Sequence, residues 1–179
     1  LRNGIKAEEE DVISARCKEA KVSIEYVDGK QVVLLNGEDV NGLIRTEEVG
    51  SMASSSSTNK DVRLQLLDLQ RELARKNDVI MDGRDIGTTV FPDAELKIFM
   101  TADPMVRAKR RADEMIAKGE KVDIQEVLKN LQERDYIDSH RSTSPLTQAE
   151  DAIVLDNSHM TMEDQMSWLK NLIKERFGC

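Results

Sequence analysis

The spacing of apolar residues changes along the chain, and each spacing predicts a different element. Apolar and polar residues alternate on both sides of Asp28-Gly29, which predicts a β-hairpin with strands near 22–27 and 31–35. Apolar residues then recur every three or four positions, which predicts a helix near 59–76. The apolar stripe of that helix consists of Val62, Leu66, Leu69 and Leu73.

Short apolar runs and amphipathic stretches follow one another in the second half of the chain. The runs predict buried strands near 78–82, 96–102 and 152–155. The amphipathic stretches predict helices over 103–119, over about 123–139 and after the helix-capping pair Thr161 and Asp164. This order favours an α/β fold with a parallel sheet and helices on its faces, in which ligands bind beyond the carboxyl ends of the strands.

Two segments are less regular. Residues 1–20 are rich in charge, which favours a solvated helix or a linker. The serine-rich stretch "ASSSSTNKD" favours a flexible connection. It ends at a predicted helix start, where Thr58 and Asp61 resemble a capping box.

Composition and charge narrow the function. Charged residues make up 34% of the 179, and the net charge of -8 argues against a general nucleic-acid binder. No apolar run is long enough to cross a bilayer, so we expect a cytoplasmic location without membrane contact. The two cysteines, Cys17 and Cys179, lie far apart and do not predict a disulfide framework. Together with the only two histidines, His140 and His159, they do not predict a metal site either.

The stretch "DGRDIG", Asp82 to Gly87, carries the first candidate chemistry. It follows the predicted strand 78–82, where ligand sites form in α/β proteins. The glycines permit a sharp turn and a close ligand approach, Arg84 offers a planar fork for phosphate, and Asp85 can hold that fork or a substrate hydroxyl. A tight turn with a local ion pair is the alternative.

Three further groups of residues could bind an anionic ligand. Arg134, Asp138 and Arg141 share one face of a predicted helix, where they could hold a phosphate and a ribose. Ser54 and Arg63 lie near a helix start and could bind a base edge or a phosphate. A basic cluster contains Arg107, Lys109, Arg110 and Arg111. For the helix of Arg134 and for the basic cluster, a solvated helix face explains the pattern equally well.

Two long stretches resemble bacterial cytidylate kinases. They are "VIMDGRDIGTTVFPDAELKIFMTADPMVRAKRRADEM" and "ERDYIDSHRSTSPLTQAEDAIVLD". The resemblance implies one P-loop NTPase-like α/β domain over 1–179, with helices on both faces of a parallel sheet. It also implies a small β-containing NMP-binding insert at 20–55 and a helical lid at 103–122. The implied activity is transfer of the γ-phosphoryl group of ATP, with Mg²⁺, to CMP or dCMP by a monomer.

The resemblance also assigns roles to the candidate residues. It implies that Arg84 grips the CMP phosphate beside Asp85 at the reacting end, and that Ser54 and Arg63 bind the cytosine edge. Arg134 and Asp138 match positions at the sugar, and Arg141 matches a further phosphate contact. The arginines that match the lid, where charge is neutralised during transfer, are Arg107, Arg110 and Arg111.

The sequence departs from the family in two places. The family begins with a strand, a G-x-x-x-x-G-K-[ST] phosphate loop and a helix, and none of these is present. We therefore expect a chain that lacks the first strand and the residues for ATP and Mg²⁺, that is marginally stable and that does not turn over alone. "SSSSTNKD" also replaces small apolar residues and a proline, so Ser55 or Ser56 could take the role of Ser54.

Two other functions fit the same residues. One is a binding module that holds CMP without transferring phosphate. The other is a kinase for UMP or another nucleoside monophosphate. Separate titrations with CMP and ATP discriminate the first alternative from the enzyme, and a panel of monophosphates discriminates the second.

Overall fold

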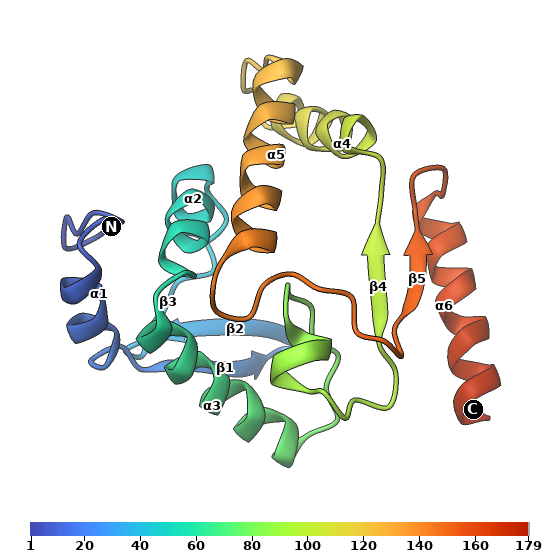
Figure 1. The fold of residues 1–179 in the computed structure, drawn as a ribbon, viewed down its shortest axis with the longest axis horizontal. Helices are drawn as coiled ribbons and strands as arrows, with labels where there is room; N and C mark the ends of the chain where they lie inside the picture. The colour runs from blue at the N-terminus through green and yellow to red at the C-terminus, as the bar shows by residue number, and fades with distance from the viewer. Residues whose placement is uncertain (179) are drawn as a thin grey trace. The chain divides into compact units, whose positions relative to one another are not determined.

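The computed structural model describes residues 1–178 and divides the chain into two compact units. Unit 1 contains Leu1–Phe91 and Ile137–Thr147, and unit 2 contains Pro92–Tyr136 and Gln148 onwards. Figure 1 labels the elements of both. In the described part of the chain, no helix is both long enough and apolar enough to cross a bilayer.

Unit 1 contains an antiparallel sheet of three short strands. β1 (Val22–Val27) pairs with β2 (Lys30–Leu35), and β2 pairs with β3 (Glu38–Asp39). Asp28 and Gly29 join the first pair, and their φ angles of 51° and 74° are those of the two-residue turn that matches strand twist. The hairpin prediction is confirmed.

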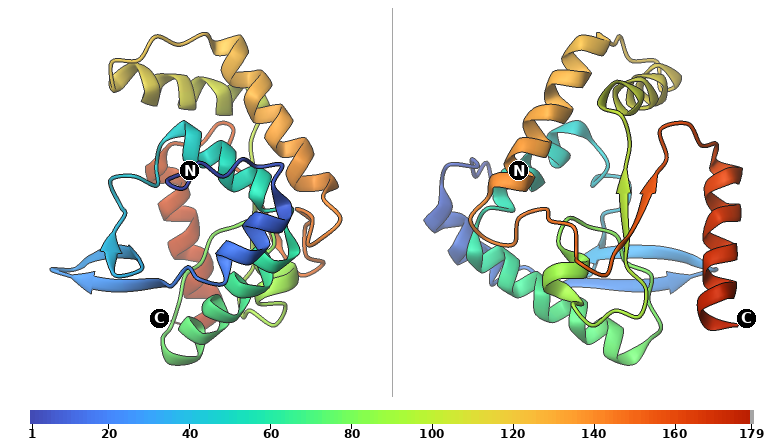
Figure 2. Two further views of the ribbon diagram at one scale, coloured as in Figure 1. Left: turned by 90° about the vertical axis from the view of Figure 1, so that its left-hand side faces the viewer. Right: turned by 45° about the vertical axis from the view of Figure 1, so that its right-hand side comes forward.

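Helices complete unit 1. They are α1 (Glu10–Cys17), α2 (Glu47–Ser56), α3 (Lys60–Lys76) and a single π-helical turn, η1 (Ile86–Val90). α1 packs against α3, as Figure 2 shows. The serine-rich stretch is not a flexible connection, because Ala53–Ser56 form the last turn of α2. Thr58 does not cap α3 either. Asn59 does, since its side chain accepts from the backbone N–H of Asp61 and Val62.

The predicted strand at 78–82 is wrong. These residues have no strand partner in residues 1–178, and the side chain of Ile80 is 99% exposed. An apolar run becomes a strand only where a neighbouring backbone accepts and donates its hydrogen bonds. Here the chain instead passes directly from α3 to the turn that begins at Gly83.

Unit 2 contains the parallel sheet that the sequence predicts. β4 (Ile98–Thr101) pairs in parallel with β5 (Ile153–Asp156), and Figure 1 shows the two strands side by side. The parallel pair and the surrounding helices confirm the α/β class. The helices are α4 (Pro104–Ala117), α6 (Met162–Phe177) and most of α5 (Ile124–His140), whose last residues belong to unit 1.

The helix starts of unit 2 follow from local sequence. Asp103 caps α4 by accepting from Met105 and Val106, with Pro104 in the first turn. Thr161 and Asp164 form a full capping box at α6. Ala108 and Ala112 are buried on α4, and Leu155 is buried on β5. The predicted capping pair of Thr161 and Asp164 is confirmed.

Candidate functional site: a buried arginine and aspartate cluster

Five charged side chains converge in unit 1. They come from the start of α3, from the turn before η1 and from the end of α5 and the loop after it. They are Arg63, Arg84, Asp85, Asp138 and Arg141. The sequence places all five in candidate sites, but in separate groups. The structure brings them into one cluster, which we call the acceptor cluster.

Asp85 and Asp138 each hold two arginines. Asp85 pairs with Arg63 and lies 3.8 Å from Arg141 Nη2. Asp138 accepts from Arg84 Nε at 3.0 Å and lies 3.6 Å from Arg141 Nη1. The side chains of Asp138 and Arg141 are only 8% and 3% exposed, whereas Arg84 is 45% exposed. Arg84 is therefore the arginine that a ligand in solvent reaches most easily.

The acceptor cluster carries one excess positive charge. Three guanidinium groups face two carboxylates, and arginine stays protonated at physiological pH. The pKa of Arg141 is lowered, first by burial and then by repulsion from Arg63, and the two aspartates only partly oppose this. A buried excess charge of this kind is stabilised when an anion binds beside it.

Several polar atoms around the cluster have no hydrogen-bond partner. Within residues 1–178 they include Ser54 Oγ, Arg63 Nε and Arg141 Nη2, all of which are buried. Buried polar atoms usually find a partner, because leaving one unpaired costs about 1–3 kcal/mol. These atoms therefore offer one hydroxyl and two N–H groups to a polar, anionic ligand.

The turn that carries Arg84 and Asp85 is held by packing and by Arg71. The φ of Gly83 is not positive, but an added Cβ would lie 2.8 Å from Ile86 Cγ1, so a larger residue there would force the Ile86 side chain to shift. Arg71 donates from α3 to the carbonyls of Thr89 and Val90 at 3.0 and 3.2 Å. The expected sharp turn is thus made by close packing rather than by left-handed glycine backbone.

Arg134 lies in unit 2 and is not one of the residues that converge in unit 1. It keeps its position four residues before Asp138 on α5, and its buried Nε has no hydrogen-bond partner in the described structure. Arg141 follows the last residue of α5 rather than lying on the helix, although its N–H still donates to the Ile137 carbonyl at 3.0 Å.

The three predicted lid arginines all have partners inside unit 2. Arg107 makes two hydrogen bonds to Asp135, at 2.6 and 3.1 Å, and this carboxylate raises its pKa. Arg111 bonds Glu114 at 3.4 Å near the surface. Arg110 donates to the Asn157 side chain and carbonyl at 3.0 and 2.7 Å, which ties α4 to the loop after β5.

Ser57 is the contact residue that the sequence did not single out. Its hydroxyl accepts from Arg141 Nη1 at 3.2 Å, and its carbonyl accepts from Arg63 Nη1 at 3.4 Å. The sequence left open which of the serines 54–57 contacts a ligand, and it favoured Ser54, with Ser55 or Ser56 as alternatives. The available signal was its place in the serine-rich stretch, six residues before Arg63.

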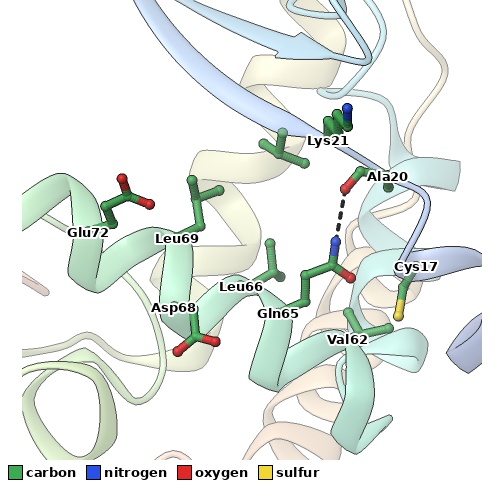
Figure 3. A pocket seen from close by; sticks show the side chains of 10 residues that line it. Cys17, Ala20, Lys21, Val62, Gln65, Leu66, Asp68, Leu69 and Glu72 are labelled. Atoms are coloured by element: carbon green, nitrogen blue, oxygen red, sulfur yellow. Dashed lines mark hydrogen bonds between the residues drawn. The ribbon is translucent and has the colours of Figure 1, made fainter.

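A separate groove lies between α3 and the segment from α1 to β1. Its cavity volume is about 460 Å³, and Val62, Leu66 and Leu69 supply its apolar side. Figure 3 shows Gln65 donating from α3 to the Ala20 carbonyl, at 2.9 Å. No residue that lines this groove belongs to the acceptor cluster, and its lining includes Asp68 and Glu72 but only one lysine, Lys21. The groove therefore does not suit a phosphate.

Comparison with known proteins identifies the family. The family model for cytidylate kinase matches residues 1–175. A curated cytidylate kinase from Parabacteroides distasonis is 51% identical over 170 residues, which cover 90% of this chain and 74% of the relative. Cytidylate kinases from Bacteroides thetaiotaomicron and Porphyromonas gingivalis are 49% and 52% identical, cover 84% and 80% of this chain, and are themselves covered over 64% and 63% of their lengths. Several relatives are thus matched over less than two thirds of their own length. The family model and these identities show that the chain belongs to the cytidylate kinase family.

Proposed function

We propose that this chain carries the acceptor side of a phosphotransferase that converts CMP or dCMP to CDP or dCDP with ATP as donor. An oxygen of the CMP phosphate forms a bond to the γ-phosphorus of ATP, and the bond between that phosphorus and the oxygen of ADP breaks. The observation that supports this most strongly is the acceptor cluster, with its excess positive charge and its unpartnered N–H groups.

The roles of the cluster residues follow from their exposure and partners. Arg84 is the most exposed arginine of the cluster, so it binds the phosphate of CMP, and Arg141 Nη2 supplies a second donor. Asp85 and Asp138 hold the guanidinium planes, and Asp138 also receives a sugar hydroxyl. The unpartnered Ser54 Oγ and Arg63 Nε bind the cytosine edge. Fixed donors of this kind lower the cost of orienting the acceptor.

The donor side is not assigned to residues of this chain. Residues 1–178 contain no group of three or more acidic, histidine or cysteine side chains placed to hold a metal. Mg²⁺ in nucleotide sites binds mainly substrate phosphates, waters and one or two side-chain oxygens. Of the proposed lid arginines, Arg107 and Arg111 bind carboxylates that a phosphate could replace, whereas Arg110 binds a backbone carbonyl and an amide oxygen.

Calorimetric titration of the purified chain tests the acceptor role. CMP and dCMP should bind, cytidine should bind at least tenfold more weakly because it lacks the phosphate, and UMP should bind more weakly because its base edge differs. A separate ATP titration distinguishes a complete kinase site from CMP binding alone. Failure of CMP to bind the folded chain, or equal binding of CMP and cytidine, would contradict the proposal.

The variant Arg84→Gln tests whether Arg84 binds the phosphate of CMP. We expect it to raise the Kd for CMP by about tenfold or more, because a charge-assisted hydrogen bond to the phosphate is lost. The control is Arg16→Gln, which removes an arginine on α1 of similar exposure whose ion pair is with Glu19, just after that helix. Equal CMP affinity in the two variants would exclude Arg84 from phosphate binding.

A further inference from the structure

Ser57 makes hydrogen bonds to Ser54, Arg63 and Arg141. Its Oγ donates to the Ser54 carbonyl at 2.7 Å and accepts from Arg141 Nη1 at 3.2 Å. Its own carbonyl accepts from Arg63 at 3.4 Å. One small residue just after α2 therefore contacts two arginines and the backbone of Ser54.

The bond to Ser57 completes the fixing of the Arg141 guanidinium plane. Arg141 Nε donates to the Ser144 carbonyl at 2.8 Å, and Nη1 donates to Ser57. Ser144 has a left-handed φ of 48°, a conformation that non-glycine residues adopt rarely. Two anchored nitrogens define the plane and direction of a guanidinium, so the remaining nitrogen, Nη2, has a fixed direction.

The fixed Nη2 is also the nitrogen without a partner. It is buried, has no hydrogen-bond partner in the described chain, and lies 3.8 Å from Asp85, an ion-pair distance rather than a hydrogen bond. Burial first and then repulsion from Arg63 lower the pKa of Arg141, and that repulsion also works against holding its guanidinium in place. A neutral hydroxyl acceptor fixes the group without cancelling its charge, whereas a third carboxylate would remove the positive excess.

We propose that Ser57 is a positioning residue that aims Arg141 Nη2 at the phosphate of the acceptor nucleotide. The inference rests on the proposed function, since it concerns the same ligand. Ser57 does not touch the nucleotide itself. It acts through Arg141, so its loss weakens recognition of the phosphate and leaves recognition of the nucleoside unchanged.

Thr58 provides a matched control for the local role of Ser57. Thr58 Oγ1 donates to the Ser55 carbonyl at 2.8 Å, three residues before it, as Ser57 Oγ does to Ser54. Only Ser57 adds a bond to an arginine. Thr58→Ala therefore removes the local hydroxyl bond alone, and Ser57→Ala removes the same kind of bond together with the anchor of Arg141.

Calorimetric titration with CMP and with cytidine, on the full chain, separates the two roles. We expect Ser57→Ala to raise the Kd for CMP roughly five- to thirtyfold and to change the Kd for cytidine less than twofold. Thr58→Ala should leave both values within twofold of the unmodified chain. Equal CMP affinity in the two variants, or an equal loss for CMP and cytidine, would overturn the positioning role.

The isosteric pair Ser57→Thr and Ser57→Val covers the case in which Ser57→Ala destabilises the fold. Both add a methyl group at the same place, and only threonine keeps the hydroxyl, so threonine should retain CMP affinity and valine should lose it. If the unmodified chain does not bind CMP, the proposed function fails. If it binds CMP and all Ser57 variants bind equally, only the positioning inference fails.

Discussion

The arginine side chains of this protein differ in the kind of acceptor that they contact. Arg63 and Arg141 pair with carboxylates, and each keeps a buried nitrogen without a partner among the residues described. Arg110 instead donates to the carbonyl and amide oxygens of Asn157. The first arrangement leaves donors for a ligand, whereas the second satisfies backbone at the end of β5. The residue type alone therefore does not distinguish a binding arginine from a structural one.

Arg110→Gln tests the structural role. We expect a loss of about 1–3 kcal/mol in the free energy of unfolding, because part-buried hydrogen bonds to the side-chain and carbonyl oxygens of Asn157 are lost. The neighbouring Arg111→Gln should change it by less than about 0.5 kcal/mol, since its bond to Glu114 is near the surface. Urea unfolding followed by circular dichroism measures both values. Similar values for the two variants would show that the bonds of Arg110 do not stabilise unit 2.

The elements of unit 1 are joined by caps as well as by apolar contact. Asn59 begins α3, accepts from Asp61 and Val62, and donates to the Glu10 carbonyl and to Ser14 on α1, at 3.2 and 2.9 Å. It is only 7% exposed. One side chain therefore starts the helix that carries Arg63 and holds α1 against it.

Substitution of Asn59 separates these two tasks. Asn59→Ala should lower the free energy of unfolding by about 2–4 kcal/mol, because it removes a helix cap and the part-buried hydrogen bonds to Glu10 and Ser14 on α1. Asn59→Asp keeps the cap but loses both donor bonds to α1. If the cap contributes to stability, this variant should lose less free energy of unfolding than Asn59→Ala. Chemical denaturation gives the values, and an alanine variant as stable as the unmodified chain would contradict the assignment.

The whole molecule is acidic, and the carboxylates with lowered pKa values occur in both units. In unit 1 the pKa of Glu38 is lowered by Arg2 and that of Glu72 by Lys76. In unit 2 the pKa of Asp151 is lowered mainly by its hydrogen bonds to Lys97, whose side chain is only 7% exposed. Because folded values lie below unfolded ones, these groups stabilise the fold above their ordinary pKa and lose that effect as pH falls.

Thermal unfolding across pH tests this linkage. The Tm should be highest near neutral pH and fall below about pH 4, where the lowered carboxylates take up protons. Asp151→Asn should lower the Tm at pH 7, and its difference from the unmodified chain should shrink as pH falls through the lowered pKa of Asp151. Asp93→Asn is the control, since Asp93 is exposed and makes no ion pair within residues 1–178. A difference for Asp151→Asn that does not change with pH would contradict the linkage.

The sequence by itself determined the elements that depend on near neighbours. The turn at Asp28-Gly29 and the caps at Asp103 and Thr161 are all present. Backbone sterics and hydrogen bonds over two to four residues control these features, so a short window of sequence contains the needed information. The sequence also named the five charged residues of the cluster as candidates, although in separate groups.

Only the tertiary structure decided which of those residues meet. Ser57 contacts Arg141 across 84 positions of sequence, and Arg84 contacts Asp138 across 54. Residues 78–82 likewise form no strand because no neighbouring strand within residues 1–178 pairs with them. A hydrogen bond or ion pair needs its partner within a few ångströms, and the path of the chain alone sets that distance.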